Sequence, residues 1–588
     1  MYNVSEQYKI DINKLVRNPS YIKVRFGIVD PQAKDDASIV GTSNAPYSDA
    51  SNIKIENVVA FRYDTLEHNT FFLDNSKHKL ADDVYTEFQG YVSGSFSNVN
   101  CEFQSPPSLI VTYPTAYEYA GLTFNFDEVR SEFSSEVLLE YYLSNVKIGE
   151  YTILPNRWDY VMKTPVPLHD ELRITFKKTN LPYKRAKLSY IAFGIIETYE
   201  DDRVVEAEQH RKVDVLSTVL PIGDFKFTFL DILNEYNPEN PSGLYQYMEQ
   251  RQPVTFEYGY QLDSGDIEWV LGGINYSTGK VLFDSNGRIP KVTITTNNTI
   301  QYLDSVYREG LYYPMGRTLY ELAQDLLDKE SVLYTLDPVL NDYITYAPLP
   351  IDTVKNNLQL IANASMSTLD VDRDGKITIS RSFESNGQTD FKFTKENSYN
   401  IPTVNKLPPL RNLVTANYTY TVKTTSEEIA KIDISGANNT EYFLEYNLAT
   451  DVSISVTGLT VVGSPQYFAR GCYITLTGNG TVTITGKLID VAEVNYVKNF
   501  NLNGVDCTIT NELITDSTWT KTYADWVGGV LLLNNEYSIE NRGYPELDPV
   551  DKVTVDTFYT LDLNTFLTEN RISYNGALKG FTKLIIAQ

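Results

Sequence analysis

The sequence predicts a mainly β protein with a few short helices, and three observations support this class. Short segments with alternating apolar and polar residues recur about every dozen residues, with turn residues between them. Tyrosine, which suits half-buried strands, occurs 44 times against 26 phenylalanines. Helical spacing of apolar residues is confined to three stretches. Hydrophobic residues make up 42% of the 588, which is enough for several cores and excludes global disorder.

The first 200 residues predict an arm followed by a β-sandwich. Residues 1–50 are polar with little period, which suggests an extended arm or an edge strand. Residues 51–200 contain short alternating segments at the spacing typical of a jelly-roll sandwich. The strands expected there include residues 52–61, 108–113, 121–126 and 171–176.

A charged segment follows the predicted sandwich. Residues 201–215 are dense in charge and poor in aromatic residues, which predicts a linker and the first domain boundary. Beyond it, alternating segments predict strands that should pair with their neighbours in the sequence. These strands are expected at residues 225–229, 254–260, 269–271 and 291–295.

Three helices are expected in the second half of the chain. Thr318 and Glu321 form a capping box, in which each side chain can bond to the other residue's backbone amide. The apolar residues that follow fall on one helical face, which predicts a helix at 318–330. Similar apolar stripes predict helices at 352–365 and 521–533.

The other elements of the second half are strands and turns. Residues 367–371 and 376–381 predict a hairpin, and the proline-rich residues 401–410 are a second candidate boundary. Gly478-Asn479-Gly480 predicts the turn of another hairpin, over 473–485. Further strands are expected at 413–421, 453–457, 552–556, 570–574 and 584–586.

The charge balance limits the class of partner. Lys and Arg number 50 against 76 Asp and Glu, so the formal net charge is −26. This argues against broad binding to nucleic acids or anionic membranes, which need a basic face. The longest apolar stretch, residues 527–533, is too short for a membrane helix. The polar start of the chain is not a signal peptide. The spacing of Cys101, Cys472 and Cys507 indicates neither a disulfide framework nor a zinc site.

The sharpest metal motif in the sequence is an incomplete calcium loop. Asp370, Asp372 and Asp374, followed by Gly375, match the first half of an EF-hand loop. Position twelve needs a bidentate glutamate, and Arg381 stands there instead. The flanking residues also predict strands rather than helices. We therefore interpret the motif as a β-turn and expect no metal or other cofactor.

No catalytic framework is recognisable. The sequence has no HExxH pair, no CxxC pair and no GxSxG elbow, and four histidines leave little material for acid–base catalysis. Carboxylate pairs are frequent, as expected by chance in a chain this acidic. We interpret them as solvated surface and predict that the protein is not an enzyme.

Aromatic residues cluster in the predicted sandwich, where they have two interpretations. Alternating aromatics fill a sandwich core, but jelly rolls can also bind sugars by stacking on rings at the loop ends. We favour the core, with an exposed tyrosine or Trp158 as the best exceptions. The cluster comprises Phe61, Tyr63, Phe71, Phe72, Tyr91, Phe96, Tyr117 and Tyr119.

Several phrases, in their order along the chain, resemble the phage tail-hub and type VI spike-hub family, as found in phages of Gram-positive hosts. They cover about residues 210–588. In the segment Arg542-Gly-Tyr-Pro-Glu-Leu-Asp-Pro-Val-Asp551, Val550 stands where that family usually has glycine, which predicts a less tight turn. The other phrases are residues 238–243, 254–259, 271–276, 318–330, 358–363, 372–377 and 571–576.

This resemblance implies a domain order for the hub-like part. It comprises a first hub-type β-barrel at 216–310, an α+β domain at 311–400, and a second barrel with inserted hairpins and C-terminal strands at 401–588. The N-terminal part resembles a galactose-binding-like jelly roll found on such tail proteins, which can read glycans or act as an adapter. Its resembling phrases are residues 61–67, 72–74, 121–126 and 183–188.

The resemblance also implies a function. Such hubs are typically homotrimers in the tail baseplate of the virion, assembled in the host cytoplasm, where they join the tail tube to the tail-tip spike. The implied partners are the chain itself, the tail tube and other baseplate proteins. The alternative is a receptor- or glycan-binding tail protein that acts on a host cell-wall glycan through the N-terminal sandwich. We disfavour a third reading, a tail-associated wall hydrolase, because little chain follows the hub-like part.

Overall fold

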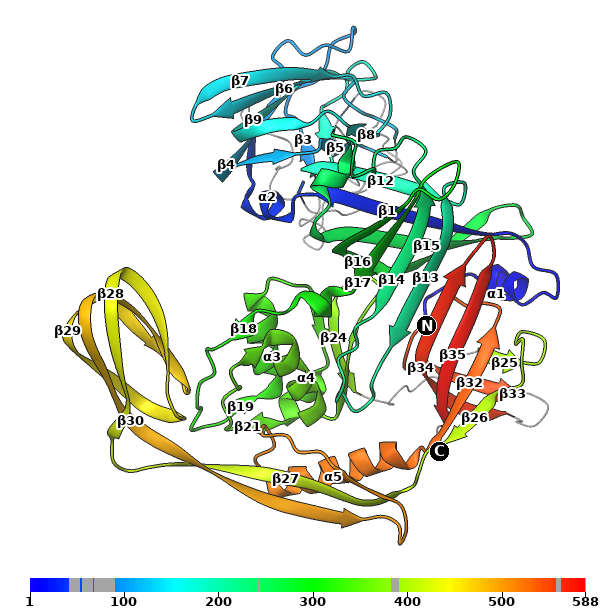
Figure 1. Cartoon of the computed structure of the whole chain (residues 1–588). Helices are drawn as coiled ribbons and strands as arrows, with labels where there is room; N and C mark the ends of the chain where they lie inside the picture. The colour runs from blue at the N-terminus through cyan, green and yellow to red at the C-terminus, as the bar shows by residue number, and fades with distance from the viewer. Residues whose placement is uncertain are drawn as a thin grey trace.

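The protein is described by a computed structural model that covers most of the chain. The described residues are 1–41, 53–54, 67, 90–128, 130–241, 243–381, 391–556 and 562–586. Strands dominate them, and the helices among them are few, which confirms the mainly β class (Figure 1). None of the helices within these ranges has the length and apolar character needed to cross a membrane.

The N-terminal unit is a two-layer β-sandwich. A five-stranded sheet in the order β2-β4-β9-β6-β7 packs against a smaller layer made of β11-β5-β8 and β10-β3. The predictions at 108–113, 121–126 and 171–176 are confirmed, whereas 52–61 lies outside the described residues except for a turn at 53–54. The strands are β2 (Ser38–Gly41), β3 (Tyr91–Val92), β4 (Ser108–Tyr119), β5 (Leu122–Asn125), β6 (Glu136–Leu143), β7 (Val146–Ile153), β8 (Asp159–Met162), β9 (Val166–Lys178), β10 (Lys187–Leu188) and β11 (Tyr190–Ala192).

Residues 1–41, the described part of the first 50, do not form an extended arm, so that alternative was wrong, and only β2 is an edge strand, in the five-stranded sheet of the sandwich. Helices α1 (Glu6–Ile12) and α2 (Pro31–Asp36) flank strand β1 (Ser20–Val29). β1 lies inside a large sheet and pairs with β12 (Gly194–Glu200) on one side and β15 (Gln250–Gln261) on the other. Ile22, Val24, Phe26 and Ile28 alternate along β1 and are buried, and burial of this apolar face holds the segment in the sheet.

The large sheet has thirteen strands and unites distant parts of the chain. Its main path is β12-β1-β15-β16-β17-β14-β13-β34-β35-β32-β26, and β33 pairs with both β25 and β34. The remaining strands are β14 (Asp224–Leu230), β16 (Ile267–Asp284), β17 (Lys291–Asn297), β25 (Lys392–Thr394), β26 (Thr403–Lys406), β32 (Asn535–Asn541), β33 (Lys552–Asp556), β34 (Leu563–Tyr574) and β35 (Leu578–Ile586).

The predicted charged linker is a central strand of this sheet. β13 (Val204–Lys212) pairs with β14 on one edge and with β34 on the other. Val204, Ala207 and Gln209 are buried, whereas Glu206 and Glu208 are exposed. The charge density that suggested a linker therefore belongs to one face of a strand.

The pairing of β13 with β34 forms a seam between two β units. We call β14–β17 with their neighbours the first β unit, and β25, β26 and β32–β35 the second β unit. The ladder runs from Ala207 opposite Tyr574 to Lys212 opposite Glu569 (Figure 1). The strands expected in two hub-like barrels thus share one sheet.

An α+β unit packs beside the sheet around the core cluster that contains Leu322, Leu358 and Trp519. Helices α3 (Leu319–Lys329) and α4 (Val354–Ala364) confirm the first two helix predictions. The capping box is also confirmed, since the Thr318 hydroxyl accepts from the Glu321 amide at 3.2 Å and the Glu321 carboxylate accepts from the Thr318 amide at 3.1 Å. Helix α5 (Ser517–Leu532) begins four residues earlier than predicted, because Asp516 caps it.

Smaller elements complete this unit. The hairpin of β23 (Ser367–Val371) and β24 (Ile377–Arg381) is confirmed, and β20 (Tyr334–Leu336) pairs parallel to β24. The short strands are β18 (Val306–Tyr307), β19 (Arg317–Thr318), β21 (Ile344–Thr345) and β22 (Asp352–Thr353), and the 3₁₀ turns are η2 (Thr299–Tyr302) and η3 (Pro338–Asp342). A further 3₁₀ turn, η1 (Leu244–Tyr247), packs against the core of the first β unit.

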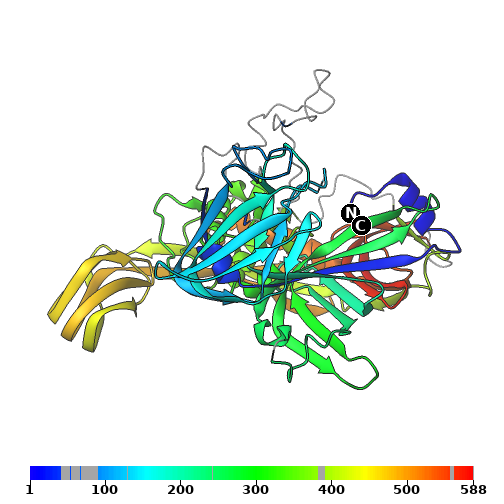
Figure 2. The ribbon, with the colours of Figure 1, turned by 90° about the horizontal axis from the view of Figure 1, so that it is seen from above.

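A separate lobe projects from the body at one end (Figures 1 and 2). It is formed by β28 (Glu427–Glu445), β29 (Ala449–Tyr467) and the first part of β30 (Gly471–Asn499). A ribbon of β27 (Leu410–Val422) and the rest of β30 connects the lobe to the body, with β31 (Val505–Thr508) beside β27.

The long strands of the lobe double back on themselves. Glu445 pairs opposite Gly471, and Ala449 pairs opposite Leu488. Four Cα steps reach at most about 15 Å, whereas β30 would place Gly471 and Leu488 about 56 Å apart if it were straight. β30 must therefore fold back, which it does at Gly478-Asn479-Gly480. The predicted hairpin over 473–485 is therefore wrong, because these residues belong to one continuous strand that bends at the glycines, and β28 and β29 flank each leg.

The doubled strands enclose a small core. Ile474 and Leu476 on one leg of β30 and Val482 and Ile484 on the other are all buried in one cluster. The lobe is thus a two-layer sandwich with its own core. A Cβ on Gly480 would lie 1.9 Å from the Thr457 carbonyl oxygen, so only glycine fits at this bend.

We predict that Gly480→Val unfolds the lobe and leaves the body folded. The clash with Thr457 cannot be relieved without moving backbone, which costs on the order of 3 kcal/mol or more. Limited proteolysis would show cleavage confined to residues 427–488. The control is Gly463→Ala, which meets open space and carries only the strain of positive φ, about 1–2 kcal/mol. An intact lobe in Gly480→Val would contradict the bend.

Candidate functional site at the junction of the β units

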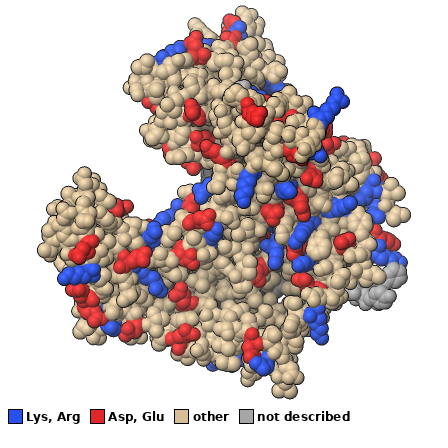
Figure 3. Space-filling view, in the orientation of Figure 1, with Lys and Arg blue, Asp and Glu red and all other residues tan. Residues whose placement is uncertain are grey.

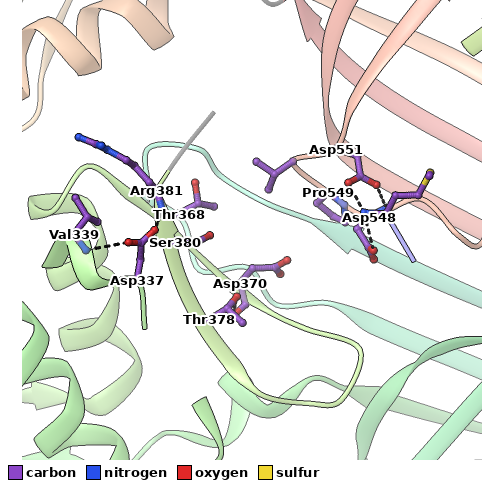
Figure 4. A pocket seen from close by; sticks show the side chains of 12 residues that line it. Asp337, Val339, Thr368, Asp370, Thr378, Ser380, Arg381, Asp548, Pro549 and Asp551 are labelled. Carbon is purple, nitrogen blue, oxygen red and sulfur yellow. Dashed lines mark hydrogen bonds and ion pairs between the residues drawn. The ribbon is translucent and has the colours of Figure 1, made fainter. Parts of the chain in front are cut away.

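A polar hollow lies where the β23–β24 hairpin, residues 337–339, the loop 548–551 and Met1 meet. Its volume is about 490 Å³. Strands β23 and β24 form one wall, and the loop 548–551 with Met1 forms the other (Figure 4). Its acidic lining residues are Asp337, Asp370, Asp548 and Asp551, and Arg381 is the one basic side chain among the described lining residues.

Two arginines hold this junction together through Asp548. Arg373, in the β23–β24 turn, donates to Asp548 at 2.8 Å and to the carbonyls of Leu271 and Pro545. Arg211, on β13, also donates to Asp548 and reaches the Val371 carbonyl at 3.0 Å. One carboxylate therefore ties the seam strand, the α+β unit and the second β unit to each other.

The charges around the hollow shift the pKa values of its carboxyl groups. Burial alone would raise the pKa of Asp548, but Arg373 and Arg211 more than offset it, so the pKa lies below its usual value. Burial raises the pKa of Asp370 to about 6, although Arg211 lies 3.3 Å away. Burial also raises the pKa of Glu546 to about 7, and its carboxyl group accepts from the Tyr8 hydroxyl at 3.2 Å.

The seam has an ionic cluster of its own. Glu569 on β34 is 3% exposed and contacts His210 at 3.0 Å, Arg571 at 2.7 Å and Lys583 at 3.3 Å. Burial would raise the pKa of Glu569, but the bond from Arg571 and the charge of Lys583 lower it below its usual value. The cluster links β13, β34 and β35 by side chains in addition to the backbone ladder.

The structure separates the three aspartates of the calcium-like motif. Asp370 faces Arg211, Asp372 accepts from the Lys376 amide at 2.9 Å, and Asp374 lies 3.4 Å from the Lys376 ammonium group. Gly375 has φ of +78°, as the predicted turn requires. Among the residues with described positions, no group of three or more acidic, histidine or cysteine side chains is arranged to hold a metal ion.

The aromatic cluster of the N-terminal sandwich divides between core and surface. Tyr91 and Tyr119 are buried, whereas Tyr117 and Trp158 are partly buried against the same core. Phe96 is 40% exposed and carries the Arg185 guanidinium over its ring. Phe61, Tyr63, Phe71 and Phe72 lie outside the described residues.

Comparison with solved structures finds tail and secretion proteins. The 43 kDa tail protein of prophage MuSo2 from Shewanella oneidensis is 11% identical, with a TM-score of 0.39 over 66% of this chain and 96% of that one. The E. coli c3393 protein, described as a type VI secretion component similar to T4 tail proteins gp27 and gp5, is 10% identical, with a TM-score of 0.32 over 66% of this chain and 74% of that one.

A third solved structure is similar to a smaller part of the chain. The family 32 carbohydrate-binding module of C. perfringens NanJ, in complex with galactose, is 13% identical, with a TM-score of 0.19 over 29% of this chain and 99% of the module. No protein-family model matches the sequence, and no curated protein matches it. At identities and scores this low, the likenesses do not assign the chain to a family.

Sequence reasoning did not find the Arg211–Arg373–Asp548 cluster. The charge pattern predicts a linker at Arg211, and the sequence around Arg373 predicts only a turn. The signal that could have indicated the junction is the segment 542–551, which resembles the hub family. Val550 in this segment has φ of +73°, so it keeps the left-handed conformation that glycine favours, and the expected looser turn is not found.

We predict that Arg373→Met destabilises the protein by about 2–3 kcal/mol, because it leaves the partly buried Asp548 with only Arg211 and the N-terminal ammonium group at 3.7 Å. Asp548→Asn in the same chain should recover part of this loss, since the unpaired charge is removed. Urea unfolding of the two single variants and the double variant measures the coupling. Strictly additive losses would contradict a shared network.

We predict that Glu546 makes the protein less stable as the pH rises. Its pKa goes from 4.5 when exposed to about 7 in the folded protein. The folded state therefore binds the extra proton between these values, and that stabilisation is lost as the pH rises through about 7. Glu546→Gln should gain stability relative to the wild type between pH 5 and pH 8, by thermal unfolding. Glu540→Gln, on an exposed part of β32, is the matched control, and an equal pH response of both variants would contradict the assignment.

Proposed function

We propose that the protein is a structural component of a phage tail baseplate and acts as its trimeric hub. The observation that carries this proposal is the β13–β34 seam, which sets two β units side by side in one sheet. The phrases that resemble the hub family fall in both units, at 254–259 and 271–276 in the first and at 571–576 in the second.

Two β units in each chain can adapt one symmetry to another. Three chains around an axis would present six β units, which matches a sixfold tail tube above and a threefold spike below. A cyclic arrangement of this kind also covers strand edges that would otherwise be open to aggregation. The function is mechanical, because the subunits hold the tail tip closed and then pass the tube or genome.

The junction gives such a hub the stiffness that it needs. Asp548 with Arg211 and Arg373 fixes the α+β unit against the seam, and Glu569 reinforces the seam itself. A ring that transmits force has to keep its two β units in one relative position. Buried, hydrogen-bonded ion pairs hold that position because breaking one leaves an uncompensated charge.

The charge of the chain fits a channel for DNA. The formal net charge is −26, and acidic and basic side chains are interspersed over the face shown in Figure 3. A channel wall without a broad basic surface does not retain a polyanion. In this proposal the partners are the tail tube and other baseplate proteins, and the site of action is the tail of the virion.

The proposal predicts that the purified chain assembles in multiples of three. Multi-angle light scattering over a concentration series should give three or six times the chain mass of 66.8 kDa. A mass of one or two chains at every concentration, with or without the tail-tube protein, would contradict the hub. Arg373→Met is the informative companion variant, because loosening the α+β unit should weaken the assembly.

A further inference from the structure

The ribbon that leads to the lobe has a free strand edge. The β29 side of β30 is covered up to Ile489, whose amide donates to the Leu448 carbonyl at 2.9 Å, and β27 covers the other side from Ile489 to Asn499. Within the described residues, no strand pairs with the outer side of residues 490–499. In Figure 1, β30 runs along the outer rim of the ribbon, and β27 and α5 lie on the inner side.

The free edge carries apolar side chains that the fold leaves uncovered. Val491 is 46% exposed, and Val494 and Val497 are each 54% exposed. Long apolar edges are normally covered, because their unpaired backbone groups bind other strands. The same edge also carries Asp490, an acidic residue near one end, and Lys498, a basic residue near the other.

We propose that this edge pairs with the same edge of a second copy of the chain, antiparallel about a twofold axis at Val494. In this register Asp490 lies opposite the partner subunit's Lys498, and Val491 lies opposite the partner subunit's Val497. Opposite charges and β-branched pairs stabilise directly facing positions. The edge is thus complementary to itself, which favours a second copy over an unrelated strand.

The geometry of the edge selects this register. Residues 490–499 are uncovered, and an axis at Val494 pairs residues 490–498 with the same residues of the second copy. Moving the axis to residue 493 would place Glu493 opposite its own copy, and like charges that face each other are destabilising. Moving it to residue 495 would carry Asp490 beyond the end of the partner's strand. Of these three axes, only the one at Val494 joins Asp490 to Lys498.

Lys498 already has one acidic neighbour in its own chain. It contacts Asp525 on α5, so in the dimer its ammonium group lies between Asp525 and Asp490 of the other copy. The resulting sheet runs β31-β27-β30 and then the same strands of the partner in reverse order. A twofold contact of this kind is closed, because both copies use the same surface.

This contact is independent of the proposed threefold hub, and solution mass separates the two. A solution mass of one chain would mean that neither contact forms. A mass of two chains would indicate the edge contact alone, three chains the hub alone, and six chains both contacts. We expect Val494→Lys to halve the mass of the wild type, because it places two ammonium groups face to face on the axis. Val462→Lys, at a 43% exposed valine on β29, is the matched control and should keep the wild-type mass. Equal masses for Val494→Lys and the wild type would overturn the proposal.

Cross-linking tests the register directly and does not depend on the folding of Val494→Lys. Residues that face each other across strands have Cβ atoms about 5 Å apart, close enough for a disulfide after small movements. Val494→Cys alone should form a covalent dimer on oxidation. Val491→Cys alone should not, because its two copies lie about 20 Å apart, but mixed with Val497→Cys it should cross-link.

The wild-type chain, with Cys101, Cys472 and Cys507, sets the background of the cross-linking experiment. A Val494→Cys chain that cross-links no more than this background overturns the twofold contact. Val491→Cys that cross-links with itself as well as Val494→Cys does would place the axis elsewhere and also overturn it.

Discussion

The backbone pairing of β13 with β34 is the constraint on which the rest of the structure depends. It joins residues 204–212 to residues more than 350 positions later and makes one sheet of two β units. Glu569 is held at this seam by three basic side chains, and its burial makes their positions hard to change. Because the seam sets the relative position of the two units, it also determines where the loop 546–551 meets the β23–β24 hairpin.

The Asp548 cluster follows from that placement. Arg211 comes from the seam strand beside the second β unit that carries Asp548, whereas Arg373 comes from a tight turn and reaches Asp548 only when the α+β unit is docked. The complete cluster therefore forms only when three parts of the chain meet at one carboxylate. Burial also raises the pKa values of its neighbours Asp370 and Glu546.

The lobe and its ribbon are held together differently from the body. The lobe has its own core, and its strands bend at glycines where a side chain would strike backbone. Beyond Ile489, no strand in the described part of the chain pairs with the outer edge of β30, so this edge depends on what lies outside the chain. A body held by buried charges and an outlying lobe on an open ribbon fit the proposed hub, which would contact more than one neighbour.

Local patterns in the sequence were enough to predict the elements whose bonded groups lie close together in the chain. The capping box at Thr318 and the turn at Gly375 were predictable because the groups that bond lie within a few positions of each other. The strand β13 was not predictable, because charged residues on one face of a strand resemble a linker until the neighbouring strands are known. The pairing of β1 on both sides was not predictable either. Only the tertiary structure decided the seam, the Asp548 cluster and the free edge of β30, since each depends on strands or side chains brought together from distant positions by folding.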